Sequence, residues 1–306
     1  MKIKNIVNQI DEFKFLIEKM QILSQSGMLF LSNQTFSTDK NILQKEYDFI
    51  EKAMLFLTEN NKSQIQIVEQ ALMQLQNISG TLVNIEKNTV LDEIELFEIK
   101  KNALLSEQIR KLNKIQDWIL LPDLSNVIRI LDPENTQIPT FYIYEAYDEN
   151  LAHLRAILRT QEENIDPKIY QQMTDLEDNI KQKLSLEIRH YCADLQQAMH
   201  QLAYLDVLIA KAKLAKEMNF CKPQIVDKET SFTQLFNPQL KTILEQSGKY
   251  FQPIDICFGD YPTLITGINM GGKTVVLRTL ALVQYLCQFG FYLPASSGLR
   301  TTMREY

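Results

Sequence analysis

Apolar residues in the first quarter of the chain recur at the alternating three- and four-residue spacing of an amphipathic helix. Polar Asn60-Asn61-Lys62 interrupts the pattern, so residues 41–79 are predicted to form one long helix or two. The first run comprises Leu43, Tyr47, Ile50, Met54 and Leu57, and the second comprises Ile65, Val68, Leu72 and Leu75. A later stripe, predicted to pack against neighbouring helices, consists of Leu202, Leu205, Ile209 and Ala212.

Residues 132–147 break this helical character. They contain two prolines and the β-prone run Phe141-Tyr142-Ile143-Tyr144, which predicts a loop with a short strand. A helix is then expected after Asn150. Another is expected with Asp166 as its N-cap and Pro167 at its first position, because both residues favour helix starts.

Composition supports a mainly helical chain. Only nine glycines and nine prolines occur in 306 residues, and the hydrophobic fraction of 45% is ample for a core. The length and composition are plausible for two domains. A cytoplasmic protein is expected, since the chain shows neither an apolar run of about 18 residues nor a charged leader followed by an apolar segment.

The cysteines and histidines give no catalytic or metal site. Cys192, Cys221, Cys257 and Cys287 are far apart and form no C-x-x-C pair, so buried free thiols are expected. His153, His190 and His200 have no partner at the spacing of a metal site or triad. No catalytic residue is assigned.

The charge balance is acidic. A net charge of −6 and an isoelectric point near 5.3 do not give the overall electrostatic footprint of a nucleic-acid binder. A local basic patch remains open, and the alternative is a solvated helix face with interspersed acids. The basic residues concerned are Lys100, Lys101, Arg110, Lys111 and Lys114.

Residues Gly267 to Thr274 match the phosphate-binding loop (P-loop, Walker A) pattern G-x-x-x-x-G-K-[ST] at every defined position. The context is strand, loop, helix: Thr263-Leu264-Ile265 predicts a buried strand, and Val275 to Cys287 predicts a helix covered on most faces. In such a loop the glycine N–H groups surround phosphate, Lys273 reaches the β and γ oxygens, and the Thr274 hydroxyl can ligate Mg²⁺.

The same stretch closely resembles the MutS family of mismatch-repair ATPases. The resemblance runs from Ile265 through Asn269-Met270-Gly271-Gly272-Lys273-Thr274 to Leu277-Arg278 and Leu293-Pro294-Ala295. Phe251-Gln252-Pro253 resembles a family element whose aromatic residue packs on adenine. The sequence is equally consistent with Phe251 being an ordinary aromatic residue of the core. Asn237-Pro238 stands where the family usually has His-Pro. Ile268 replaces the usual proline and Val275 a hydroxyl residue, which places the chain nearer the divergent MutS-like branches.

This resemblance implies a helical core and lever domain over residues 1–225, followed by the N-terminal part of an ABC-type ATPase domain over 226–306. The fold class is thus mainly α with a C-terminal α/β part. The family's DNA clamp would be reduced here, since residues 150–204 look almost wholly helical. The acidic strand-end residue that completes such an ATPase lies past Tyr306 in the family, so this truncated chain is expected not to hydrolyse ATP alone.

The implied ligands are ATP or ADP with Mg²⁺, held by Gly267, Asn269, Met270, Gly271, Gly272, Lys273, Thr274 and Phe251. The implied partners are double-stranded or branched DNA and, in the full-length form, a second copy as a homodimer. One alternative is an ATP-driven remodelling chaperone acting on a protein client such as a cobalamin-dependent aminomutase. Another is a structural helical protein with a vestigial loop.

Overall fold

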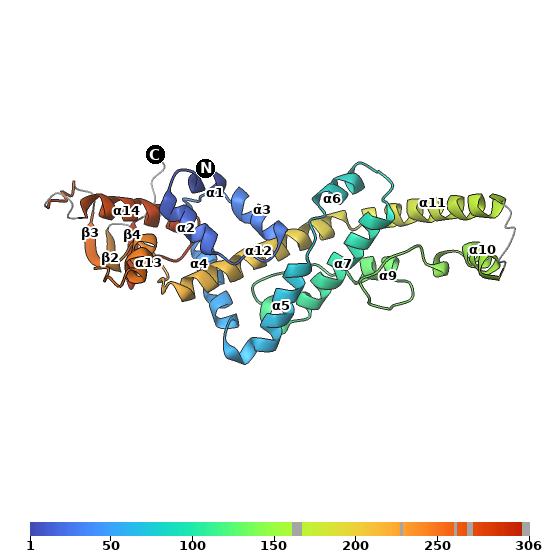
Figure 1. The fold of residues 1–306 in the computed structure, drawn as a ribbon, viewed down its shortest axis with the longest axis horizontal. Coiled ribbons are helices and arrows are strands. Elements are labelled where there is room, and N and C mark those ends of the chain that lie inside the picture. Colours follow the sequence, from blue (N-terminus) through green and yellow to red (C-terminus); the bar gives the residue numbers. More distant parts are fainter. Residues whose placement is uncertain (161–166, 227–228, 260–261, 268–271, 302–306) are drawn as a thin grey trace. The chain divides into compact units, whose positions relative to one another are not determined.

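The computed structural model describes residues 1–160, 167–226, 229–259, 262–267 and 272–301. The chain divides into two compact units. The first, here the mixed unit, contains residues 1–23, 27–65 and the chain from 204 onward, and it carries the sheet. The second, here the helical unit, contains residues 24–26 and 66–203. Helix α12 (Cys192–Glu217) contributes residues to both (Figure 1).

The helical unit is built from α-helices and one short 3₁₀ turn among its described residues (Figure 1). Helix α7 packs against α9, and α11 packs against α6, α9 and α10. Asp92 starts α7 with a capping box, because its carboxylate accepts the Glu95 N–H at 2.8 Å while the Glu95 side chain accepts the Asp92 N–H at 3.1 Å. The elements that lie wholly within this unit are α6 (Ser79–Glu86), α7 (Glu93–Arg110), α8 (Asn113–Gln116), α9 (Ser125–Leu131), η2 (Glu145–Tyr147), α10 (Glu149–Thr160) and α11 (Pro167–Arg189).

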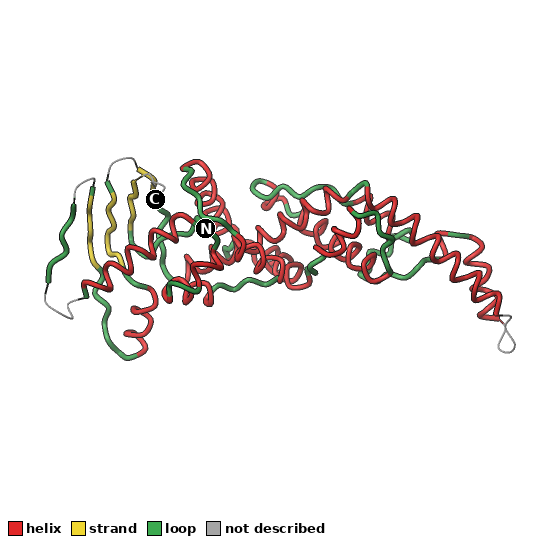
Figure 2. Tube along the Cα trace, turned by 90° about the horizontal axis from the view of Figure 1, so that it is seen from above, coloured by secondary structure: helices red, strands yellow, loops and turns green. Residues whose placement is uncertain are grey.

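The mixed unit begins with short helices and ends with the sheet. Its helices are α1 (Ile3–Val7), α2 (Asp11–Lys19), α3 (Gln25–Asn33), α4 (Lys40–Phe56), α13 (Pro238–Gln246) and α14 (Lys273–Gln288). Its strands are β1 (Gln224–Val226), β2 (Thr230–Leu235), β3 (Ile254–Phe258) and β4 (Ser297–Thr301). The strand order is β1-β4-β2-β3; β1 pairs with β4 in parallel, and β2 pairs antiparallel with β3 and β4. Figure 2 shows α14 running alongside these strands.

The predicted helical region 41–79 forms two helices, α4 and α5 (Lys62–Gln74), joined by the 3₁₀ turn η1 (Glu59–Asn61). The break falls at the polar residues because the Asn61 side-chain amide donates to the Phe56 carbonyl at 2.9 Å and satisfies the end of α4. Leu43, Tyr47 and Ile50 are buried as predicted, but Met54 and Leu57 are only half-buried. The late stripe on α12 is confirmed: Leu202, Leu205, Ile209 and Ala212 are all buried.

The predicted strand at 141–144 is wrong, whereas the predicted loop is confirmed. Aromatic rings pack on one another here instead of entering a ladder: the rings of Tyr142 and Tyr144 have centroids 4.2 Å apart, and Tyr147 packs edge-on against Tyr144. The next helix starts at Glu149, after Asp148, whose carboxylate accepts the N–H of Asn150. Helix α11 starts at Pro167 as predicted, while Asp166 lies outside the described residues.

Lys100 is not part of a solvated face, which corrects the sequence-based prediction. Its side chain is fully buried, and its ammonium donates to Asp132 Oδ1 at 3.0 Å and to the Tyr144 hydroxyl at 2.8 Å. A charge removed from water needs such partners, so Lys100 and Asp132 attach the loop to α7. Burial acts to raise the pKa of Asp132, but hydrogen bonds from Gln137, Lys100 and Thr136 outweigh it and hold that pKa below its usual value.

None of the four cysteines, all of them described, forms a disulfide, as predicted, but only Cys287 is fully buried. Cys192 and Cys221 are half-buried and Cys257 is exposed, because β3 presents alternate side chains to solvent. Within the described part of the chain, no helix is both long enough and apolar enough to cross a membrane.

Candidate functional site

The start of α14 has the geometry of an anion site. Gly272 is its N-cap, with φ 83° in the left-handed region that favours glycine, and a Cβ there would meet no atom within 4 Å. The first helical hydrogen bond runs from the Val276 N–H to the Gly272 carbonyl at 3.0 Å. The N–H groups of the first turn that come before Val276 have no acceptor within the helix. They therefore point out of the helix end, where the helix dipole also favours a negative charge.

Lys273 closes the loop that leads into this helix. Its ammonium donates to the carbonyl of Gly267, six positions earlier in the chain, at 2.6 Å. Thr274 follows in the first turn and is exposed. Of the remaining predicted site residues, Asn269, Met270 and Gly271 lie outside the described residues. The structure thus brings Gly267, Gly272, Lys273 and Thr274 together at one helix end.

The strand predicted at Thr263-Leu264-Ile265 is wrong. Residues 262–267 belong to no helix or strand, and Leu264 is 85% exposed. No described strand pairs with this segment, and Leu264 is left uncovered while Ile265 is half-buried. The helix that follows is confirmed, although its exposed Leu277 shows that the first turns of α14 are not covered on all faces as predicted.

An apolar cavity of about 340 Å³ lies beside the start of α14. Phe251, from the loop between α13 and β3, forms one wall and is half-buried. The first turns of α14 and residues of α13 also line it. Among the lining residues are Leu240, Leu244, Gly272, Val275, Val276 and Thr279. The cavity therefore adjoins the anion site, which is the arrangement that a ligand with an apolar ring and a charged tail requires.

Asn237 connects α13 to α14 at this cavity. Its side-chain oxygen accepts the Leu240 N–H at 3.0 Å and caps α13, while its amide lies 3.4 Å from the Thr279 hydroxyl. Pro238 takes the first helical position, where a missing N–H costs nothing. The Asn-Pro pair noted in the sequence therefore fixes one wall of the cavity.

The far end of α14 is held by side-chain and main-chain groups from distant segments. The Tyr47 hydroxyl donates to the Cys287 carbonyl at 2.8 Å, and the Ser37 N–H donates to the Gln288 carbonyl at 2.9 Å. Lys211 of α12 donates to the Phe289 carbonyl at 2.8 Å and lies over the ring of Phe291. These contacts satisfy carbonyls that a helix end leaves without partners. Both ends of α14 are thus fixed by specific residues.

Lys211 was not predicted from the sequence, although it lies between Ala210 and Ala212, a residue of the predicted buried stripe, in a mostly apolar stretch. It is fully buried, with Glu46 Oε2 3.8 Å from its ammonium. Burial lowers the pKa of Lys211 to about 8, against the opposing effect of Glu46.

This pKa predicts a rise of stability with pH. Between pH 8 and its ordinary value of 10.5, Lys211 keeps its proton in the unfolded chain but has lost it in the folded one. Folding is therefore favoured more as pH increases. The free energy of unfolding of the unmodified chain, minus that of Lys211→Met, is expected to increase by roughly 2–3 kcal/mol across this window in urea titrations. A flat or falling difference would contradict the buried-lysine assignment.

The structure is thus a mainly helical chain with a small C-terminal mixed sheet and a glycine-capped helix. No family model matches the chain. It is 34% identical over 213 residues to the DNA mismatch repair protein MutS of Lactobacillus delbrueckii subsp. bulgaricus, covering 68% of this chain and 24% of that protein. It is 29% identical over 242 residues to the Endonuclease MutS2 of Caldicellulosiruptor bescii, covering 76% of this chain and 28% of that protein.

A third relative, the Endonuclease MutS2 of Geobacillus thermodenitrificans, is 36% identical over 124 residues, which is 40% of this chain and 15% of that protein. The chain belongs to the MutS family. It spans about a quarter of the length of the first two relatives.

Proposed function

We propose that the chain binds ATP at the start of α14, as part of a MutS protein that acts on DNA in mismatch repair or recombination. The observation that carries the proposal is the junction of a glycine-capped helix start with an apolar cavity walled by Phe251. The triphosphate would lie at the N–H groups of the first turn and at Lys273, and the adenine would enter the cavity. Asn269, Met270 and Gly271 belong to the proposed loop by family resemblance.

Mg²⁺ fits the proposed site through one described group, the Thr274 hydroxyl. Thr274 is exposed in the first turn of α14, beside the predicted phosphate position. The ion would neutralise phosphate charge when bound. Among the described residues no cluster of three or more histidine, cysteine or acidic side chains is placed to hold a metal. Phosphate oxygens and retained waters would be the other ligands of a nucleotide-bound Mg²⁺.

The role of Phe251 can be tested separately from phosphate binding. Phe251→Ala is expected to weaken ATP binding roughly tenfold, because stacking of a base on an aromatic ring contributes on that scale. Binding of inorganic triphosphate, which has no base, should not change. Isothermal titration with both ligands measures this, and Tyr250→Ala is the control, since Tyr250 is the adjacent aromatic residue and is 78% exposed. Equal losses for both ligands would contradict stacking.

DNA association is proposed from the names of the relatives and is tested by titration with labelled duplex and branched DNA. Binding through phosphate contacts should weaken steeply with salt, because bound counterions are released. ATP should modulate this binding in the unmodified chain but not in Lys273→Ala. In the full-length protein a homodimer is the proposed assembly.

One observation favours the second candidate, an ATP-driven remodelling protein with a protein client. Residues 150–160 and 167–204 are almost entirely helical in α10, α11 and α12, which supports a reduced DNA clamp. Absence of DNA binding even at low salt, together with retained ATP binding, would favour this candidate over the first.

A further inference from the structure

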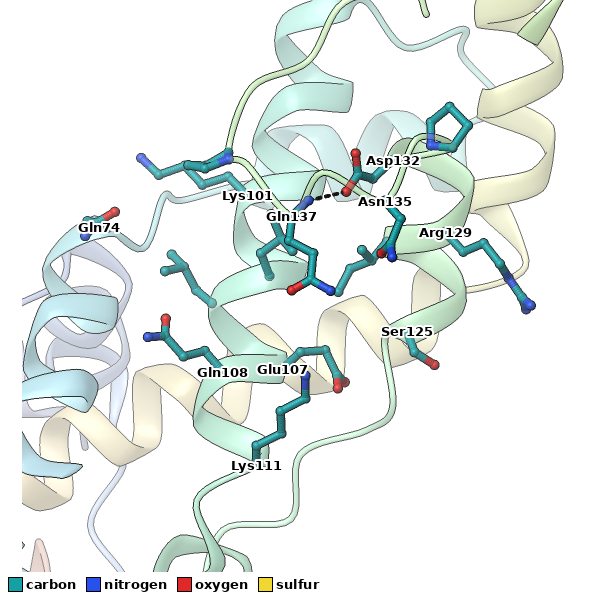
Figure 3. A pocket seen from close by; sticks show the side chains of 15 residues that line it. Gln74, Lys101, Glu107, Gln108, Lys111, Ser125, Arg129, Asp132, Asn135 and Gln137 are labelled. Atoms are coloured by element: carbon teal, nitrogen blue, oxygen red, sulfur yellow. Dashed lines mark hydrogen bonds between the residues drawn. The ribbon is translucent and has the colours of Figure 1, made fainter. Parts of the chain in front are cut away.

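The helical unit contains a groove of about 880 Å³ that the proposed ATP site does not involve. It is formed by one face of α7, by α9, and by the loop that follows Asp132 (Figure 3). Its volume lies in the range of sites that accept small organic ligands. The lining is mixed, with Leu104, Leu105 and Ile128 among polar and charged side chains.

Three cations border this groove. Lys101 and Lys111 belong to α7 and its C-cap, and Arg129 belongs to α9; Figure 3 shows them on three different sides. None of the three forms an ion pair with a carboxylate among the described residues, and Arg129 donates only to the Asn126 side chain. Ten positions on one helix separate Lys101 from Lys111 by roughly 15 Å along its axis. An anion that contacts both lysines would therefore need its charge spread over a length such as that of a nucleotide, not concentrated at one point.

The two acids of the groove do not cancel these cations. Glu107 accepts two hydrogen bonds from Arg110, at 2.8 and 2.7 Å, and a third from the Leu124 N–H at 2.9 Å. Asp132 is neutralised by the buried Lys100 and accepts the Gln137 N–H at 2.7 Å. Both carboxylates are thus satisfied by groups that lie outside the ring of three cations. The groove is left with an excess of positive charge.

Carboxamides complete the lining. Gln108, Asn135 and Gln137 are exposed there and offer both donors and acceptors. The backbone holds Asn135 and Gln137 in the left-handed region, with φ 52° and 54°, a conformation that is uncommon for residues other than glycine. The hydrogen bond from Gln137 to Asp132 fixes this loop over the groove. Groups of this kind can recognise the uncharged part of a ligand, such as a sugar or a base edge.

We infer that this groove binds a phosphate-ester ligand of nucleotide size through Lys101, Lys111 and Arg129. The phosphate ester can come from a free nucleotide or from a short segment of a single-stranded nucleic acid, and the chemistry recognised is the same. The site is distinct from α14, so it stands or falls independently of the ATP proposal.

The experiment uses the Lys273→Ala chain, in which ATP binding at the α14 site is expected to be weakened. This chain is titrated with ATP and, separately, with a short single-stranded oligonucleotide, and then again after Lys101→Gln, Lys111→Gln and Arg129→Gln are added. The matched control adds Lys45→Gln, Lys87→Gln and Lys183→Gln instead, which removes the same charge from exposed positions outside the groove. Circular dichroism confirms that every variant is folded.

Saturable binding of either probe, weakened at least about tenfold by the groove variant but not by the control, is the expected result, since hydrogen bonds to charged groups contribute on that scale. The probe that binds identifies the source of the ester. Failure of both probes to bind, or equal weakening by the groove and control variants, would overturn the inference. If the unmodified chain did not bind ATP at α14, the result expected for the groove would still be the same. The groove proposal and the ATP proposal can therefore fail independently.

Discussion

Replacing Lys273 with alanine is expected to weaken ATP binding by about one to two orders of magnitude. The ammonium is already placed at the loop by its bond to the Gly267 carbonyl, and it can turn to phosphate oxygens without a change in the helix. A hydrogen bond between charged partners contributes about 1.5–3 kcal/mol, which gives that range of affinities. Isothermal titration with ATP and Mg²⁺ measures the effect.

Lys249→Ala is the control for this prediction, because Lys249 is an exposed lysine of the same unit outside the helix start. It should leave ATP affinity unchanged. An affinity for Lys273→Ala within about twofold of the unmodified chain, a difference well under 1 kcal/mol, would reject α14 as the phosphate site.

Asp132→Ala is expected to lower the free energy of unfolding by about 3–5 kcal/mol, because it leaves the fully buried Lys100 without its carboxylate. The loop also loses the hydrogen bonds from Thr136 and Gln137 to Asp132. Urea unfolding followed by circular dichroism gives the measurement. Glu134→Ala removes the same charge from an exposed position of the same loop and should change stability by no more than about 0.5 kcal/mol.

The ion pair between Lys100 and Asp132 makes the stability of the protein sensitive to acid. The pKa of Asp132 is lowered in the folded chain, so its contribution to stability is complete above the ordinary value of 3.8 and is lost as the pH falls through the lower folded value. Asp132→Ala should therefore flatten the acid limb of the stability profile. Equal stabilities of Asp132→Ala and Glu134→Ala would show that Lys100 finds another partner and would contradict this account.

Helical periodicity predicted individual helices well but not the role of each charged residue. Lys100 and Lys101 are neighbours in sequence, yet Lys100 is buried against Asp132 and Lys101 borders the groove. A helix turns about 100° per residue, so adjacent lysines face different surroundings. The groups that surround Lys100 come from the loop at Asp132, much later in the chain. A local sequence pattern does not reveal this contact.

The strand predictions failed for a related reason. Both Phe141–Tyr144 and Thr263–Ile265 have strand-forming composition, but a strand needs a partner with free hydrogen-bonding groups. Tyr144 instead donates to the Thr140 carbonyl and receives the Lys100 ammonium. No described strand pairs with residues 263–265, and Leu264 is exposed.

The sequence by itself determined the helical character of the chain and the placement of Gly272, Lys273 and Thr274 at a helix start, because periodicity, capping and glycine conformations are local. It left open whether residues 41–79 form one helix or two, and the structure shows two. Only the tertiary structure decided that Lys211 holds the far end of α14, that Phe251 walls a cavity beside its start, and that Arg129 joins Lys101 and Lys111 around one groove. These arrangements depend on contacts between residues far apart in the chain, and hydrophobic burial of the intervening elements fixes them.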